Sequence, residues 1–98
     1  MSYKLKFTKH SNKAWAKLDT AIAAQFKKKL KERLENPKVS KDKLSGYENI
    51  YKIKLRSAGY RLAYEVKEET IVVLVLTIGK RENNQVYKNL QNRKDDEQ

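Results

Sequence analysis

Residue types that often carry chemistry or shape turns are scarce in this chain. It contains no cysteine, one histidine, one proline and three glycines. Without cysteine the chain forms neither a disulfide nor a thiolate metal site, so a reducing cytoplasm is the simplest compartment to expect. Because His10 is the only histidine, a ribonuclease mechanism that needs two imidazoles is excluded within one chain.

Long apolar runs and common catalytic motifs are also missing. No stretch approaches the roughly 20 apolar residues of a membrane span, and the first residues alternate as in a strand, so we expect neither a membrane partner nor an export signal. The sequence has no zinc-type spacing of histidines and acids, no Walker loop and no dinucleotide-binding glycine motif. Its carboxylates lie mostly in turns and at the end of the chain, with no pair suited to glycosidase or metal-ion work. We therefore expect no metal and no cofactor.

Positive charge is what the chain has in excess. It carries 23 Lys and Arg residues against 12 Asp and Glu, a formal net charge of +11 in 98 residues. Such a charge favours a polyanionic partner, nucleic acid first and an acidic protein second. Residues 95–98 are Asp-Asp-Glu-Gln, which we expect to form an acidic, disordered tail after one domain at 1–94.

The spacing of apolar residues predicts seven elements in the order strand, two helices, three strands, helix. Strands are expected at 2–8, 48–56, 60–66 and 70–78, and helices at 11–18 and 82–90. A longer second helix, which Asp19 or Thr20 can cap, lies between the first helix and the strand at 48–56. The apolar stripe of the second helix is Ile22, Phe26, Leu30 and Leu34, and Asn36-Pro37 ends that helix. The strand at 70–78 is apolar on both faces, which is typical of a central strand covered on both sides.

The residues from Tyr51 to Arg61 alternate between apolar and cationic side chains. With the two-residue period of a strand, one face receives apolar side chains and the other a row of positive charge. The apolar set is Tyr51, Ile53 and Leu55, and the cationic set is Lys52, Lys54 and Arg56. So much positive charge on one small surface favours a site that holds an anion.

The strand that follows determines how far this cationic surface extends. If Ala58-Gly59 forms a two-residue connection, Arg56 pairs with Arg61, and the large apolar residues of both strands share one face. Arg61 then belongs to the cationic face. Like charges directly opposite each other are unfavourable, and a bound anion would offset that cost.

Each of these positions also has an ordinary structural interpretation. The cationic side chains at 52–56 can be interpreted simply as the polar side of an edge strand, where lysine discourages aggregation. Lys27-Lys28-Lys29 fits a solvated helix face as well as a docking surface for RNA. We favour the anion site because Arg61 and Arg81 add to the same cluster. Tyr87, in the expected last helix, fits packing and function equally well.

Several stretches match a known family. The most specific are Lys43-Leu44, Gly46, Tyr51 to Ser57, Gly59 to Leu62, Gly79 to Glu82 and Val86-Tyr87. On these residues the chain resembles the RelE toxins of bacterial toxin–antitoxin pairs, nearly end to end from Tyr3 to about Leu90. The resemblance implies a single compact α+β domain of the microbial-ribonuclease-like type, shared with the ParE toxins, in which helices pack on a mainly antiparallel sheet.

The resemblance also implies an activity: ribosome-dependent cleavage of messenger RNA in the decoding A site, by attack of a 2′-hydroxyl on the neighbouring phosphate. The residues that match the family's catalytic set are Lys52, Lys54, Arg61, Arg81 and Tyr87. Lys54 is the candidate base, because nearby cations lower a lysine pKa. RNA or ribosome contacts are expected from Lys27, Lys28, Lys29, Lys43, Arg56 and Lys80. Ser45 stands where close relatives carry a basic residue, which affects one RNA contact and not the whole reaction.

The expected partners follow from the same resemblance. They are a RelB-like antitoxin, the 70S ribosome with messenger RNA and 16S rRNA, and operator DNA only through the toxin–antitoxin complex. Two alternatives remain open from the residues: a ParE-like toxin that inhibits gyrase without cutting RNA, and a simple basic RNA-binding module. DNA supercoiling assays separate the first from a ribonuclease, and salt-dependent RNA binding without new RNA ends identifies the second.

Overall fold

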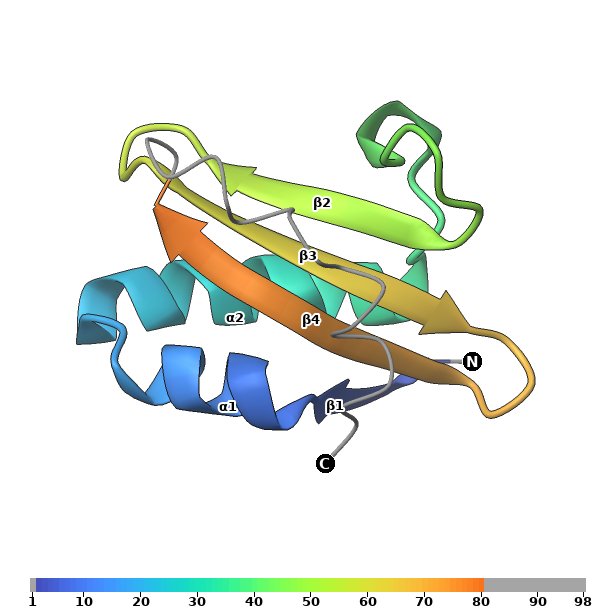
Figure 1. Cartoon of the computed structure of the whole chain (residues 1–98), viewed down its shortest axis with the longest axis horizontal. Helices are drawn as coiled ribbons and strands as arrows, with labels where there is room; N and C mark the ends of the chain where they lie inside the picture. Colours follow the sequence, from blue (N-terminus) through green and yellow to red (C-terminus); the bar gives the residue numbers. More distant parts are fainter. Residues whose placement is uncertain (1, 81–98) are drawn as a thin grey trace.

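A computed structural model of the chain describes residues 2–80. Its elements are β1 (Lys4–Phe7), α1 (Lys9–Ala16), α2 (Thr20–Glu35), the short 3-10 helix η1 (Ser40–Asp42), β2 (Ile50–Leu55), β3 (Tyr60–Lys67) and β4 (Val72–Lys80) (Figure 1). The predicted α+β order is confirmed over this range. The expected helix at 82–90 and the tail at 95–98 lie outside the described residues.

The four strands form one mixed sheet in the order β1-β4-β3-β2. β3 pairs antiparallel with both β2 and β4, while β1 pairs parallel with β4. The predicted, mainly antiparallel sheet is therefore confirmed, with β4 and β3 as its two inner strands. Within residues 2–80, β2 is an edge strand, and its outer side faces α2 across a groove described below.

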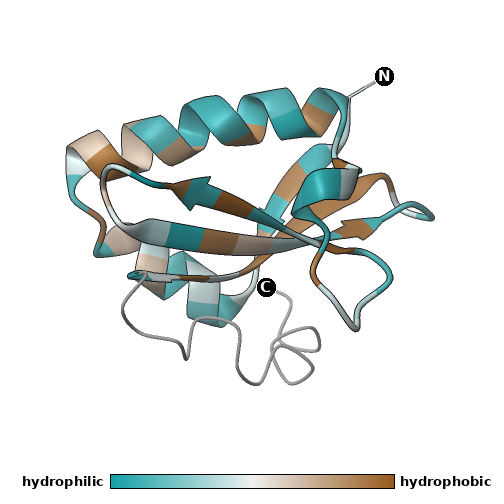
Figure 2. Ribbon diagram, turned by 90° about the horizontal axis from the view of Figure 1, so that it is seen from above, coloured by the Kyte–Doolittle hydropathy of each residue, from teal (hydrophilic) through white to brown (hydrophobic). Residues whose placement is uncertain are grey.

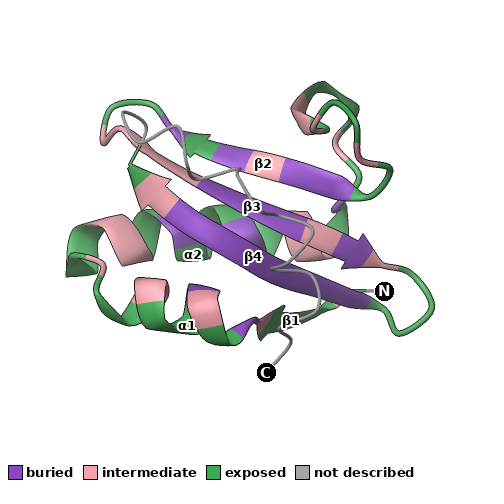
Figure 3. Cartoon of the chain, viewed as in Figure 1, coloured by how far each residue is buried: buried purple, intermediate pink, exposed green. Residues whose placement is uncertain are grey.

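The central strand β4 is buried on both faces, as its continuous apolar sequence predicts. Figure 3 shows β4 buried over most of its length. Val73, Val75 and Ile78 enter a core shared with the helices, whereas Leu74 and Leu76 enter a second cluster on the other face. The step from Val75 to Ile78 breaks the two-residue alternation because the register with β3 shifts near Ala63 and Tyr64. This bulge returns Ile78 to the helix-facing core after one additional residue.

Helix α1 begins two residues before the expected start at residue 11. Thr8 caps it: the Thr8 hydroxyl accepts a hydrogen bond from the Ser11 backbone N–H, and the Ser11 hydroxyl accepts one from the Thr8 N–H. Both side chains are fully buried, and Ser11 Oγ donates to the carbonyl of Val75 at 2.7 Å. This reciprocal cap fixes the helix start against the bulged part of β4.

Helix α2 confirms the predicted apolar stripe. Phe26 and Leu30 are buried completely, and Ile22 and Leu34 pack against the same core. In Figure 2 apolar bands alternate with hydrophilic ones along α2, and the helix ends at Asn36 as expected. In the described range no helix combines the length and apolar character needed to cross a membrane.

The β2–β3 hairpin keeps the predicted faces but not the predicted pairing. Arg61 lies opposite Lys54, and not opposite Arg56 as expected, because the connection contains four residues and not two. The Gly59 N–H donates to the Leu55 carbonyl at 2.8 Å, and Gly59 has φ of +71°. Glycine adopts this left-handed conformation without a steric penalty, so Gly59 closes the longer turn.

Candidate functional site

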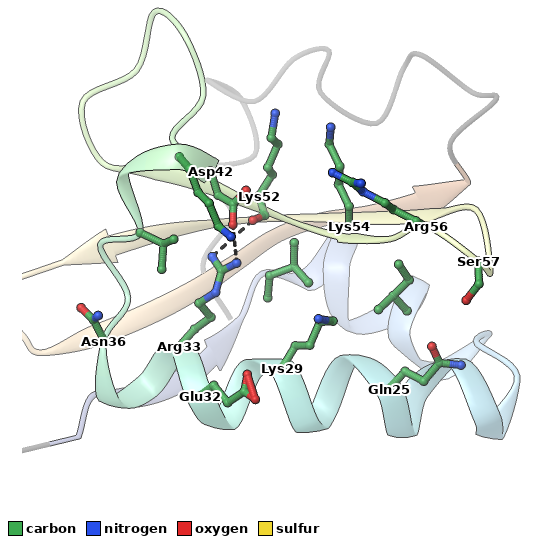
Figure 4. A pocket seen from close by; sticks show the side chains of 14 residues that line it. Gln25, Lys29, Glu32, Arg33, Asn36, Asp42, Lys52, Lys54, Arg56 and Ser57 are labelled. Carbon is green, nitrogen blue, oxygen red and sulfur yellow. Dashed lines mark hydrogen bonds and ion pairs between the residues drawn. The ribbon is translucent and has the colours of Figure 1, made fainter.

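Three predicted catalytic cations lie on the sheet face opposite α2. Lys52 and Lys54 come from β2, and Arg61 lies directly across from Lys54 on β3. Figure 4 shows the side chains of Lys52 and Lys54 rising from β2 in the same direction, away from α2. On its other side Arg61 pairs with Gly79 of β4. The register therefore gathers this positive charge at one end of the sheet.

The charges in this cluster act on one another. The ammonium group of Lys52 lowers the pKa of Lys54, and partial desolvation and the guanidinium groups of Arg61 and Arg56 lower it further. A lysine whose pKa is lowered is more often a neutral amine near physiological pH. Lys54 is thus the cluster's best candidate for a proton acceptor, while Lys52 and Arg61 offer positive charge for a phosphate.

A groove of about 1120 Å³ runs along the outer edge of β2, between this strand and α2 (Figure 4). Lys52, Lys54 and Arg56 form its border toward the cationic face, and Lys29 reaches into it from α2. A smaller hollow at the tip of the hairpin, lined by Arg56, Tyr60 and Arg61 among others, shares Lys54 with the groove. Lys54 and Arg56 thus border both hollows.

Arg33 links four segments below this groove. Its guanidinium donates to the Tyr64 hydroxyl at 2.8 Å and to the backbone carbonyl of Lys52 at 3.3 Å, and pairs with Asp42 at 2.6 Å. Burial disfavours the charged form of Arg33, but the contacts with Tyr64 and Asp42 outweigh it and raise the pKa. Arg33 therefore stays charged and ties α2 and η1 to the edge strand that carries Lys52.

Tyr64 completes the same network from β3. Its ring is fully buried and stacks on Tyr51, and its hydroxyl donates to the carbonyl of Pro37 at 2.6 Å. Burial raises the pKa of the Tyr64 hydroxyl, although Arg33 opposes this, so the hydroxyl keeps the proton it donates. Sequence reasoning missed Arg33 and Tyr64. In the sequence, Arg33 stands out only as the single arginine of α2, near the end of that helix. Its ion pair with Asp42 can be recognised only once the fold is known.

The remaining predicted site residues are dispersed. Lys27, Lys28 and Lys29 are exposed on α2, and of these three Lys29 lines the groove. Lys43 is exposed beside β2, where it forms an isolated bridge with Tyr51. Lys80 pairs with Tyr60 at the end of β4, which places it by register on the face opposite Arg61. Arg81 and Tyr87 lie outside the described residues.

Among residues 2–80 no group of three histidines or acids lies close enough to hold a metal ion. The cluster instead offers amine and guanidinium groups, which suit the binding of phosphate and the transfer of a proton next to it.

Comparisons with known proteins identify the family to which the chain belongs. Residues 5–85 match the family described as the ParE toxin of the type II toxin–antitoxin system, parDE. The chain is 49% identical over 87 residues to the mRNA interferase toxin RelE of Escherichia coli strain K12, a match that covers 89% of this chain and 92% of that protein.

Solved structures of E. coli RelE share the fold. An arginine-to-alanine double mutant of that toxin in the free state superposes with a TM-score of 0.88 at 46% identity, covering 95% of this chain and 98% of the other. The toxin in the intact E. coli RelBE toxin–antitoxin complex gives a TM-score of 0.79 at 48% identity, covering 81% of this chain and 96% of the other. The predicted RelE-like architecture is confirmed. The chain belongs to the RelE toxins, within the RelE/ParE family of bacterial type II toxin–antitoxin systems.

Proposed function

We propose that this protein is an endoribonuclease toxin that cleaves messenger RNA and so inhibits translation. Its similarity to a protein named as an mRNA interferase toxin supports the substrate and the reaction class. The observation that carries the proposal is the hairpin register, which sets Lys54 directly opposite Arg61 with Lys52 on the same strand and face. Such an arrangement of one proton acceptor and two fixed cations is what phosphodiester cleavage by a neighbouring 2′-hydroxyl requires.

In the proposed reaction, Lys54 as a neutral amine removes the proton from the ribose 2′-hydroxyl. The resulting oxygen attacks the adjacent phosphorus, and the bond to the 5′-oxygen breaks as that oxygen takes up a proton from a solvent water. The products are a 2′,3′-cyclic phosphate and a 5′-hydroxyl end. Lys52 and Arg61 neutralise the charge that develops on the phosphate. The roles of Arg81, in assisting the leaving oxygen, and of Tyr87, in stacking on a base, rest on the family resemblance in sequence.

We further propose that cleavage takes place in the A site of the ribosome and that the toxin acts in the cytoplasm. A cluster that relies on one weak base depends strongly on how the RNA is positioned, and a ribosome holds the codon in one geometry. We propose a RelB-like antitoxin as the neutralising partner, which the similarity to the E. coli RelE chain in the RelBE complex supports.

Mapping of RNA 5′ ends in a translating extract tests the proposal. We expect the wild-type protein to create new ends within codons, and Lys54→Ala to reduce their rate of formation by about 10²–10³. Lys54 is exposed, so the variant should retain the wild-type melting temperature. Equal cleavage by a folded Lys54→Ala protein would refute the role of Lys54, and a wild-type protein that creates no ends would refute the proposed activity.

One observation favours a second candidate, since the matching family is described by its ParE toxin. A gyrase inhibitor on this scaffold would block DNA supercoiling by purified gyrase and leave messenger RNA intact. We expect no effect on supercoiling at protein concentrations that stop translation.

A further inference from the structure

Among the charged residues that line the groove between α2 and β2, cationic residues predominate. Six of its lining residues are cationic, and two are acidic. The cations are Lys29, Arg33, Lys41, Lys52, Lys54 and Arg56. One of the acids, Asp42, is neutralised by its ion pair with Arg33, which leaves Glu32 as the other acidic lining residue.

The groove is continuous with the proposed cleavage site. Lys52 and Lys54 belong to both, because their side chains stand on the edge strand that separates the cationic sheet face from the groove. Its volume of about 1120 Å³ exceeds the roughly 300–1,000 Å³ of a typical small-molecule pocket, so it can hold more than one nucleotide. Its far wall carries Lys29 on α2 and Lys41 on η1, both exposed.

We propose that this groove binds the backbone phosphates of the substrate RNA next to the phosphate that is cut. The inference rests on the proposed function and extends it, because it assigns a path to the strand. The RNA crosses the edge of β2 at Lys52 and Lys54 and continues into the groove, where Lys29 and Lys41 pair with flanking phosphates. Lysine provides a flexible point charge, so these contacts hold the backbone without reading its bases.

The fold supports this path in a further respect. Arg33 occupies the floor of the groove and pairs there with Asp42 and the carbonyl of Lys52. An acid that would repel phosphate is thereby neutralised, and a backbone group of the edge strand is already satisfied. An anionic RNA strand in the groove therefore contacts the lysines that line it above Arg33.

A double-mutant cycle on programmed ribosomes tests the path. We would measure KM and kcat for cleavage of a messenger RNA whose flanking phosphates are replaced one at a time by neutral methylphosphonates. The proteins are the wild type, Lys29→Ala/Lys41→Ala, and the charge-matched control Lys13→Ala/Lys31→Ala. Lys13 and Lys31 are exposed helix residues that do not line the groove.

We expect the groove variant to raise KM about threefold to tenfold with little change in kcat, as for two partly exposed ion pairs. For at least one flanking position, the methylphosphonate should raise KM for the wild type and the control but cause no further loss for the groove variant. Such coupling identifies the messenger RNA itself as the ligand.

Additive penalties at every position would overturn the inference, even if the lysines mattered, because ribosomal RNA or a protein would then be what they contact. A wild-type protein that leaves the unmodified message intact would instead overturn the proposed function. The two failures are therefore distinguishable.

Discussion

In the proposed site, single residues determine whether the cationic cluster only binds RNA or also cuts it. Lys54 is the residue whose protonation matters most, since a permanently charged lysine holds a phosphate but accepts no proton. The neighbours that we propose to bind the phosphate, Lys52 and Arg61, are among the groups that lower the pKa of Lys54. Binding and catalysis are thus coupled through charge, and removing one cation should weaken both.

The pH dependence of cleavage follows from this coupling. With Lys54 as the base, the single-turnover rate rises with pH while its ammonium form predominates and levels off above its pKa, which lies below the ordinary 10.5. Lys52→Met removes the largest cause of the lowering, so the rise should move to higher pH and the rate at neutral pH should fall. Lys31→Met, on the exposed side of α2, should leave the profile in place. A slower Lys52→Met enzyme with an unshifted profile would show that Lys54 is not the base.

At the scale of elements, the buried hydroxyl pair at the start of α1 holds the helix to the central strand. Ser11→Ala removes the donor to the Val75 carbonyl and half of the reciprocal cap. We expect a loss of about 2 kcal/mol in the free energy of unfolding, which corresponds to a fall of roughly 10 °C in Tm. Thermal unfolding followed by circular dichroism would measure it, with the exposed Ser2→Ala as the control. If the two variants were equally stable, Ser11 would not be what holds α1 to the central strand.

The elements also show what alternation in a sequence can and cannot predict. The period of two assigned Lys52, Lys54 and Arg61 to one face, because a slip by one residue would bury charge. It did not determine the pairing, since a slip by two residues keeps every side chain on its face. The left-handed Gly59 decided that point and moved Lys54, in place of Arg56, opposite Arg61.

At the scale of the whole molecule, the sequence predicted the fold class, the apolar stripe of α2 and the central place of the strand near residue 75. The parallel pairing of β1 with β4 was not predictable, because pairing between distant strands leaves no local signal. The network around Arg33 and Tyr64 was equally hidden, since its members lie on five separate segments. The proposed site thus depends on local alternation for its residues and on long-range packing for its support.

The chemistry of the RNA ends on a programmed ribosome tests the central claim most directly. Purified ribosomes would be loaded with a defined messenger RNA that has an empty A site, and the fragments analysed after addition of the protein. We predict a 2′,3′-cyclic phosphate on the upstream fragment, a 5′-hydroxyl on the downstream one, and much faster cleavage with ribosomes than on free RNA. Fragments with 5′-phosphate ends, equal cleavage of free RNA, or an intact message would contradict this account.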